Sequence, residues 1–235
     1  MEISLEQLTM EFGLCCKFLN EPLRFKIYTL SHIKKLLQTD AYAARQKVLS
    51  VIWHNINALQ QALDYCYDNS ILSFRVTSDL IPHLTNLQKL NVLDDNLLTE
   101  IQEQLSKIND HGIKLSMHPG QHVNMGSPHK HVVSNSLQDL KEHFFIADLV
   151  QCTEINIHIG GTYGDKNKST KSFINNMRQL IPADKMKYMT IENDELNYSV
   201  EDIVSVAKEL GIRATYDIHH QRCYNLKTPS RKTEQ

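Results

Sequence analysis

The chain has 235 residues, of which 41% are hydrophobic and 22% charged, and its formal net charge is −2. This length suffices for one large α/β domain or at most two small ones. The near-neutral charge argues against attraction of nucleic acid by the whole surface and leaves open only a local basic groove. Five cysteines, an odd number without a CxxC pair, indicate neither a disulfide framework nor a zinc knuckle.

The N-terminal stretch "MEISLEQLTMEFGLC" carries acidic side chains where a signal peptide would carry basic ones. No run of the sequence approaches the roughly 18 apolar residues that a membrane span needs. We therefore expect a soluble intracellular protein without a membrane partner. The sequence does not distinguish the cytoplasm from the nucleus.

Strand-like and helical segments alternate in the first half of the chain. The run "EFGLCCKFL" (11–19) predicts a first strand. Apolar residues then recur every three or four positions from Gln46 to Asn69, which predicts a helix with one buried face. The β-rich run "ILSFRVTSD" (71–79) follows it directly. A further helix is predicted over Asp95–Asn109, with a strand in "HGIKLSMH" (111–118) behind it.

The same alternation continues in the second half. A helix over residues 136–150 precedes "EINIHIGG" (154–161), and one over residues 171–180 precedes "MKYMTIENDE" (186–195). The last predicted helix has the clearest ends, because Ser199 and Asp202 form a capping-box-like start and Gly211 can close it in the left-handed conformation. It leads into "IRATYDIHH" (212–220), the sixth strand.

Six short apolar strands with helices between most of them predict a parallel sheet covered by helices. Polar residues fall at the carboxyl ends of five consecutive strands. In a parallel barrel these ends meet at one mouth, whereas in an open sheet only the strands beside a switch point contribute to a site. We therefore expect a TIM-type (β/α) barrel, incomplete with about six strands. The polar residues in question are Asp79, His118, His158, Glu192, Asp217, His219 and His220.

Histidine nitrogens and carboxylate oxygens at one mouth suit divalent zinc, manganese or iron. His118, His158 and Glu192 follow three successive strands, and Asp217 and His220 follow the next. Two or three ions about 3.5–4 Å apart would activate water and stabilise both oxygens of a phosphodiester displacement. These residues therefore indicate a metal-dependent hydrolase.

Each motif alone also has a structural interpretation. The stretch "HPGQ" from His118 fits a strand-ending turn, "HIGG" from His158 fits a tight turn, and "ENDE" fits a solvated acidic loop. The purely structural interpretation requires independent coincidences at the same end of four successive strands. The conjunction of the motifs, and not any single motif, therefore favours a site.

These residues also match a known family. In order and spacing, the chain resembles the ultraviolet damage endonucleases from about Glu11 to Gln221. The resemblance implies a TIM barrel that cuts double-stranded DNA immediately 5′ of ultraviolet photoproducts, with a multinuclear metal site usually described with manganese; zinc and magnesium are the alternatives. It is carried by "RVTSDLIPH", "LSMHPGQHVNMGSP", "NIHIGGTYGDK", "TIENDE" and "YDIHHQ".

The resemblance also implies roles for individual metal ligands. His118 and His158 would bind one ion, and Glu192 would bridge it to a second. Asp217 would bind the second ion or bridge to a third, which His220 would bind. Among these residues Glu192, His158 and Asp217 are the predicted catalytic group. His219 would point to the opposite side of its strand from His220 and is not predicted to be a ligand.

Further positions are implied to contact DNA. Gln121 and His122 match the pair that the family inserts at the damaged site, with a histidine here where the family usually has an aromatic such as tyrosine. A photodimer stacks and pairs poorly, which lowers the cost of flipping it out. Asn20 would contact the lesion strand. Lys166 and Lys168 are candidates for phosphate contacts or for an ordinary solvated surface.

The chain departs from the family after His220, where the family continues with two further βα units that supply more ligands. We expect a single barrel domain over residues 1–221 with a polar tail over 222–235. An incomplete barrel exposes its edge strands, which favours an oligomer or a complementing chain. Two rival functions stay open: a sugar-isomerase-like metal barrel enzyme, and an inactive or partner-dependent lesion-binding homologue.

Overall fold

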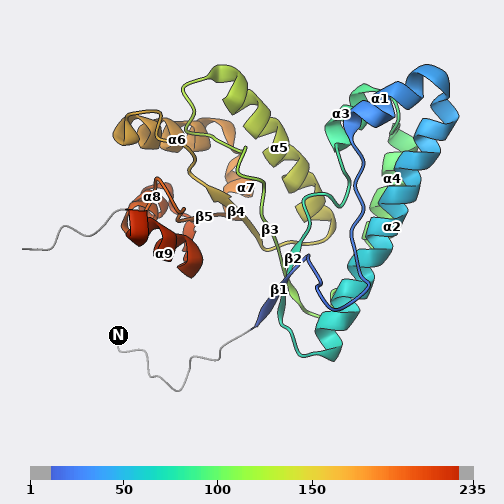
Figure 1. Ribbon diagram of the computed structural model, residues 1–235, viewed down its shortest axis with the longest axis horizontal. Coiled ribbons are helices and arrows are strands. Elements are labelled where there is room, and N and C mark those ends of the chain that lie inside the picture. Colours follow the sequence, from blue (N-terminus) through green and yellow to red (C-terminus); the bar gives the residue numbers. More distant parts are fainter. Residues whose placement is uncertain (1–11, 228–235) are drawn as a thin grey trace, which may run out of the picture. The chain divides into compact units, whose positions relative to one another are not determined.

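A computed structural model describes residues 12–227, which form two compact units (Figure 1). The first unit comprises the described residues up to Met117 together with Asp148–Thr153. The second comprises His118–Ala147 and the described residues from Glu154 onward. All five cysteines are free thiols.

The first unit contains three parallel strands, and two helices lie between each strand and the next in the chain. Strand β2 pairs with β1 on one side and with β3 on the other. Leu14, Phe74 and Leu115 are partners across these three strands, and the side chains of Phe74 and Leu115 are buried. The elements are β1 (Gly13–Cys15), α1 (Leu30–Thr39), α2 (Ala41–Asp68), β2 (Ser73–Val76), α3 (Leu84–Lys89), α4 (Asp95–Leu105) and β3 (Lys114–Met117).

The second unit repeats the pattern with three more parallel strands. Strand β5 pairs with β4 and with β6. The register sets His158 opposite Glu192, and Glu192 opposite Thr215. The elements are α5 (Lys130–Leu149, whose last two residues belong to the first unit), β4 (Glu154–His158), α6 (Lys166–Leu180), α7 (Ala183–Met186), β5 (Met189–Glu192), α8 (Val200–Leu210), β6 (Arg213–Thr215) and α9 (Ile218–Lys227).

Alternation along β4 separates an apolar face from a polar one. Ile155 and Ile157 are buried on the first face. Glu154, Asn156 and His158 share the second face because side chains two positions apart in a strand point the same way. The polar face therefore carries the residues that later form the site.

Helix α8 has the ends that the sequence predicts. The Ser199 side chain accepts from the Asp202 N–H, and the Asp202 carboxylate accepts from the Ser199 N–H at 2.8 Å, which completes a capping box. Gly211 ends the helix with a φ of 69°, in the left-handed region that glycine adopts without steric cost.

The prediction for the last strand is wrong at its carboxyl end. Strand β6 stops at Thr215, and His219 and His220 lie in the first turn of α9. Asp217 explains this, since its carboxylate accepts from the N–H of His220 at 2.8 Å as a helix N-cap does. The argument that His219 and His220 point to opposite faces of a strand therefore does not apply. Residues 222–227 of the predicted tail belong to α9, and residues 228–235 lie outside the described residues.

Several helices differ from the sequence prediction in length or were not predicted. Helix α2 starts five residues before Gln46 because the Asp40 side chain caps it by accepting from the N–H of Ala43. Helix α6 likewise begins at Lys166, where the Asp165 side chain accepts from the N–H of Lys168. The sequence analysis missed α1, α3, α7 and α9.

Replacing the cap of α8 should destabilise the fold. We expect Ser199→Ala to lower the free energy of unfolding by about 1 kcal/mol, because an N-terminal N–H of the helix loses its acceptor. Ser205→Ala, at an exposed position of the same helix, is the matched control and should be neutral or slightly stabilising. Urea unfolding followed by circular dichroism measures both variants, and equal stability of the two would contradict the role of the cap.

Candidate metal site at the strand ends

Three strand ends bring two histidines and one glutamate together. His158 ends β4, Glu192 ends β5 directly opposite it, and His118 follows β3 in the chain. Nε2 of His158 lies 3.1 Å from Oε1 of Glu192, and Nε2 of His118 lies 3.5 Å from the same oxygen. Ligand atoms of these three residues lie within 4.8 Å of one another, a spacing that can hold one metal ion.

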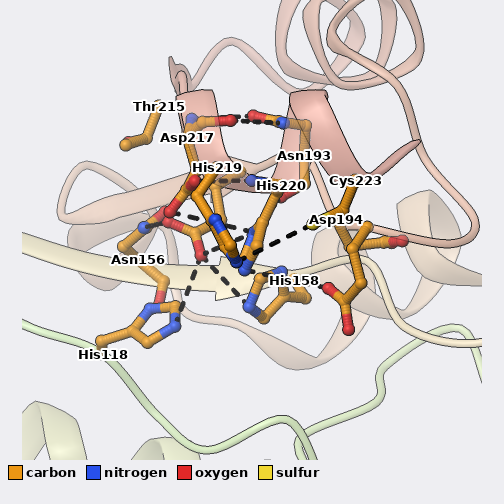
Figure 2. A network of polar contacts seen from close by, with 12 residues as sticks. His118, Asn156, His158, Asn193, Asp194, Thr215, Asp217, His219, His220 and Cys223 are labelled. Atoms are coloured by element: carbon orange, nitrogen blue, oxygen red, sulfur yellow. Dashed lines mark hydrogen bonds and ion pairs between the residues drawn. The ribbon is translucent and has the colours of Figure 1, made fainter. Parts of the chain in front are cut away.

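The start of α9 adds a second group that shares Glu192. Ligand atoms of Glu192, Asp217 and His220 also lie within 4.8 Å of one another. Nδ1 of His220 is 3.8 Å from Oε1 of Glu192, and the rings of His158 and His220 are 5.3 Å apart (Figure 2). The structure therefore brings together all five residues that the sequence analysis selected as ligands.

Two of the histidines are oriented by backbone carbonyl groups. Nδ1 of His118 lies 2.8 Å from the carbonyl oxygen of Asn156, and Nδ1 of His220 lies 2.9 Å from that of Asn193. A histidine that donates one ring N–H to a carbonyl keeps its other nitrogen free as a ligand, and metal-binding histidines are commonly held in this way. In His118 the ligand nitrogen is then Nε2, the atom that faces Glu192. In His220 it is also Nε2, which lies 3.8 Å from Oε2 of Glu195, because Nδ1 faces the carbonyl.

His158 lies deeper than the other two rings. Only 6% of its surface is exposed, and its buried Nδ1 has no hydrogen-bond partner in the described part of the chain. Burial lowers the pKa of His158 and outweighs the opposing effect of the Glu192 charge. The ring is therefore neutral near pH 7, which is the form that binds a metal ion.

Asn193 holds Asp217 in place from the end of β5. Its amide nitrogen donates to the carbonyl of Asp217 at 2.9 Å, and its amide oxygen accepts from the N–H of Asp217 at 2.9 Å (Figure 2). Burial raises the pKa of Asp217, but the N–H of His220 and the charge of that ring outweigh it and lower the pKa overall. Asp217 is thus ionised near pH 7 and can bind a cation.

The predicted lesion-contacting pair lies on an exposed turn of the second unit. Gln121 lines a small pocket of about 150 Å³ together with His158, Gly160 and Asp194. Gly160 has a φ of 105°, and a Cβ there would meet the side chain of Asn124 at 2.5 Å, so this glycine is needed for the shape of the loop.

His122 is exposed but anchored. Its Nε2 lies 2.9 Å from Oδ2 of Asp139, and Nδ1 of His143 lies 3.0 Å from the other oxygen of that carboxylate. Burial raises the pKa of Asp139, but the hydrogen bonds and charges of His143 and His122 outweigh it and lower the pKa. Asp139 therefore fixes the ring of His122 at this turn.

The other predicted contact residues have different surroundings. Asn20 is exposed at a bend in the first unit. Lys168 is exposed on α6, whereas Lys166 forms an ion pair with Asp202 and lies 5.2 Å from the centre of the Tyr198 ring. The ammonium group of Lys166 thus interacts with other side chains of the protein, whereas that of Lys168 is at an exposed position.

The sequence analysis missed three polar residues that support this site: Asn156, Asn193 and Asp139. Asn156 could have been recognised from the sequence, because it lies two positions before His158 in a predicted strand and so shares its face. The roles of Asn193 and Asp139 depend on contacts with residues 24 and 17 positions away in the chain, which no local pattern encodes.

Enzymes with a (β/α)-barrel fold build their active sites at the carboxyl ends of parallel strands that alternate with helices. The histidine–carboxylate cluster of this chain lies at such strand ends. The particular family follows from sequence comparison: the model of the UV-endonuclease UvdE family matches residues 10–235. The chain therefore belongs to the UvdE family, which confirms the resemblance seen in its motifs.

Individual relatives agree with this assignment. A UV DNA damage endonuclease of Clostridium perfringens is 31% identical over 188 residues, which cover 77% of this chain and 44% of that protein. A protein of the same name from a Nostoc species is 30% identical over 219 residues, which cover 91% of this chain and 66% of that protein. The chain thus spans less than two thirds of the length of either relative.

A solved structure confirms the fold class. The crystal structure of SacUVDE matches with a TM-score of 0.78 at 28% identity, over 92% of this chain and 71% of that one. Together with the six parallel strands, this match confirms the predicted barrel class. Among residues 12–227, no helix is long and apolar enough to cross a membrane.

Divalent ions should stabilise the protein through this site. At an Mn²⁺ concentration of 100 times the dissociation constant, binding to the folded state alone adds about 2.7 kcal/mol to the free energy of unfolding. We expect His158→Ala to lose this gain, because it removes the most buried nitrogen ligand. His32→Ala, on the exposed surface of α1, should keep it. Thermal unfolding with and without Mn²⁺ measures the effect, and an unchanged Mn²⁺ response in His158→Ala would refute the assignment.

Proposed function

We propose that this chain is a metal-dependent DNA repair endonuclease that cuts double-stranded DNA immediately 5′ of ultraviolet photoproducts. The observation that carries the proposal is the convergence of Nε2 of His118 and Nε2 of His158 on one oxygen of the buried Glu192 in a chain of the UvdE family. The names of the curated relatives support DNA carrying ultraviolet damage as the substrate.

Two or three divalent ions, with manganese favoured over zinc or magnesium, are proposed as cofactors. His118, His158 and Glu192 would hold one ion, and Glu192, Asp217 and His220 would hold another. Bound ions supply positive charge that stabilises the transition state of phosphodiester hydrolysis and activates water for the attack.

The chain itself prepares the site for this chemistry. Burial keeps His158 neutral, and hydrogen bonds keep Asp217 ionised, so both are in their ligand forms near pH 7. The carbonyl groups that orient His118 and His220 are part of the folded backbone, so these rings need little reorganisation when they bind. We propose Glu192, His158 and Asp217 as the catalytic residues.

The exposed turn beside the site would contact the damaged DNA. Gln121 borders the pocket that His158 also lines, and His122 presents a flat ring held by Asp139. We propose that these two side chains take the space left by flipped nucleotides, since a flat imidazole can stack as larger aromatic rings do. Asn20 is proposed as a further contact to the lesion strand.

We also propose that strand β6 can accept another chain, either a second copy or a complementing one. Within the second unit β6 pairs with β5, and its Arg213 and Ala214 are exposed. Exposed strand edges are sites of strand addition.

The central test is incision of an ultraviolet-irradiated duplex oligonucleotide in the presence of Mn²⁺. We expect a single cut immediately 5′ of the photoproduct, and no cut in the unirradiated duplex. His158→Ala and Glu192→Gln should reduce the rate by at least about 100-fold, because Glu192 belongs to both ion groups and His158 is the most buried nitrogen ligand of the first. His32→Ala is the matched control. Binding without incision would favour a lesion-binding homologue, and neither binding nor incision would favour the sugar-isomerase alternative.

Substitutions at the exposed turn should affect recognition of damage and not metal binding. We expect Gln121→Ala to weaken binding to damaged duplex about 10-fold while affinity for intact duplex stays the same, since a good contact between a glutamine amide and a base contributes about 1–3 kcal/mol. Asp139→Ala should act in the same direction by releasing His122. Fluorescence anisotropy with damaged and intact duplexes measures both variants. Equal losses on the two duplexes would argue against a role in sensing the lesion.

A further inference from the structure

The two carboxylate oxygens of Glu192 have different surroundings. Oε1 faces the three histidine rings, at 3.1 Å from His158, 3.5 Å from His118 and 3.8 Å from His220. Oε2 accepts a hydrogen bond from the side-chain amide of Asn156. Glu192 therefore offers one oxygen to the metal site while the other is held within the protein.

The orientation of the Asn156 amide follows from its partners. A carboxylate only accepts hydrogen bonds, so the NH₂ group of Asn156 must face Glu192. The amide oxygen then faces Thr190, whose hydroxyl lies 2.9 Å away and donates to it. Asn156 and Thr190 are partners in the register of β4 and β5, so the sheet itself sets this contact.

A second row of polar groups supports Thr190. Its hydroxyl lies 3.1 Å from Oε1 of Glu154 and 3.4 Å from the hydroxyl of Thr215, which also lies 3.4 Å from that glutamate oxygen. Arg213 lies 3.6 Å from the other oxygen of Glu154. Polar groups thus continue across one face of all three strands of the second unit.

The hydrogen bond between Asn156 and Glu192 is buried. Asn156 and Thr190 are each 1% exposed and Glu192 is 3% exposed, so water does not substitute for a lost hydrogen bond. A buried carboxylate is costly without hydrogen-bond donors, so the donor from Asn156 favours the observed orientation of Glu192.

We propose that Asn156 is a positioning residue that holds the carboxylate of Glu192 through Oε2, so that Oε1 faces the histidine rings. This inference rests on the proposed metal site. It deepens that site by naming the side chain that orients Glu192, the residue common to both ion groups.

Asn156 also allows a clean experiment, because its backbone carbonyl orients His118 independently of its side chain. Asn156→Leu preserves that carbonyl and much of the side-chain volume but removes the donor to Glu192. Thr190→Val removes a single hydroxyl and leaves Asn156 in place without its orienting partner. Asn175→Leu, at an exposed position of α6, is the matched control.

The probe is Mn²⁺ alone, measured by calorimetry and by electron paramagnetic resonance on the full chain. We expect Asn156→Leu to weaken Mn²⁺ binding about 10- to 100-fold and to change the spectrum of bound Mn²⁺, as loss of a group that orients a ligand does. Thr190→Val should show a smaller loss in the same direction. Adding it to Asn156→Leu should cause no further loss, because Thr190 acts through Asn156. Asn175→Leu should match the wild type.

The possible failures are distinguishable. If the wild type binds Mn²⁺ and Asn156→Leu binds it with the same affinity and spectrum, the positioning role is refuted while the metal site stands. If the wild type binds no Mn²⁺, the proposed metal site itself is refuted. Should Asn156→Leu not fold, as judged by circular dichroism, Thr190→Val decides the question, and wild-type affinity in that variant would overturn the inference.

Discussion

The site depends on one buried acidic side chain, that of Glu192 at the end of β5. A carboxylate that is 3% exposed is stable only with hydrogen-bond donors or cations around it. Asn156 supplies a donor to one oxygen, and three histidine rings surround the other. The arrangement around Glu192 is therefore that of a group prepared to bind positive charge.

The two faces of β4 and β5 in the second unit differ in polarity. The apolar side chains of β4 and β5 lie on one face of the strands, as in any sheet covered by helices. The other face carries hydrogen-bonded Asn156 and Thr190 where barrels usually carry large branched residues. Polar packing of this kind gives up hydrophobic stabilisation in exchange for fixed side-chain directions, which a metal site requires.

Asp217 has two roles that connect local structure with the site. Its carboxylate caps α9, and Asn193 clamps its backbone to the end of β5. The capping explains why the chain turns from strand to helix just where the ligands are needed. Helix α9 brings His220 within 3.8 Å of Glu192, a placement that a continuing strand would have changed.

The sequence by itself determined the alternation of strands and helices, the capping box of α8 and the five ligand candidates, because these follow from periodicity and from residue types at strand ends. It misjudged "YDIHH", where Asp217 favours a helix cap over a strand. Only the tertiary structure decided that Asn156 holds Glu192, that Asn193 clamps Asp217 and that Asp139 anchors His122. Each of these contacts joins residues far apart in the chain, and side-chain hydrogen bonds of that range leave no periodic pattern in a sequence.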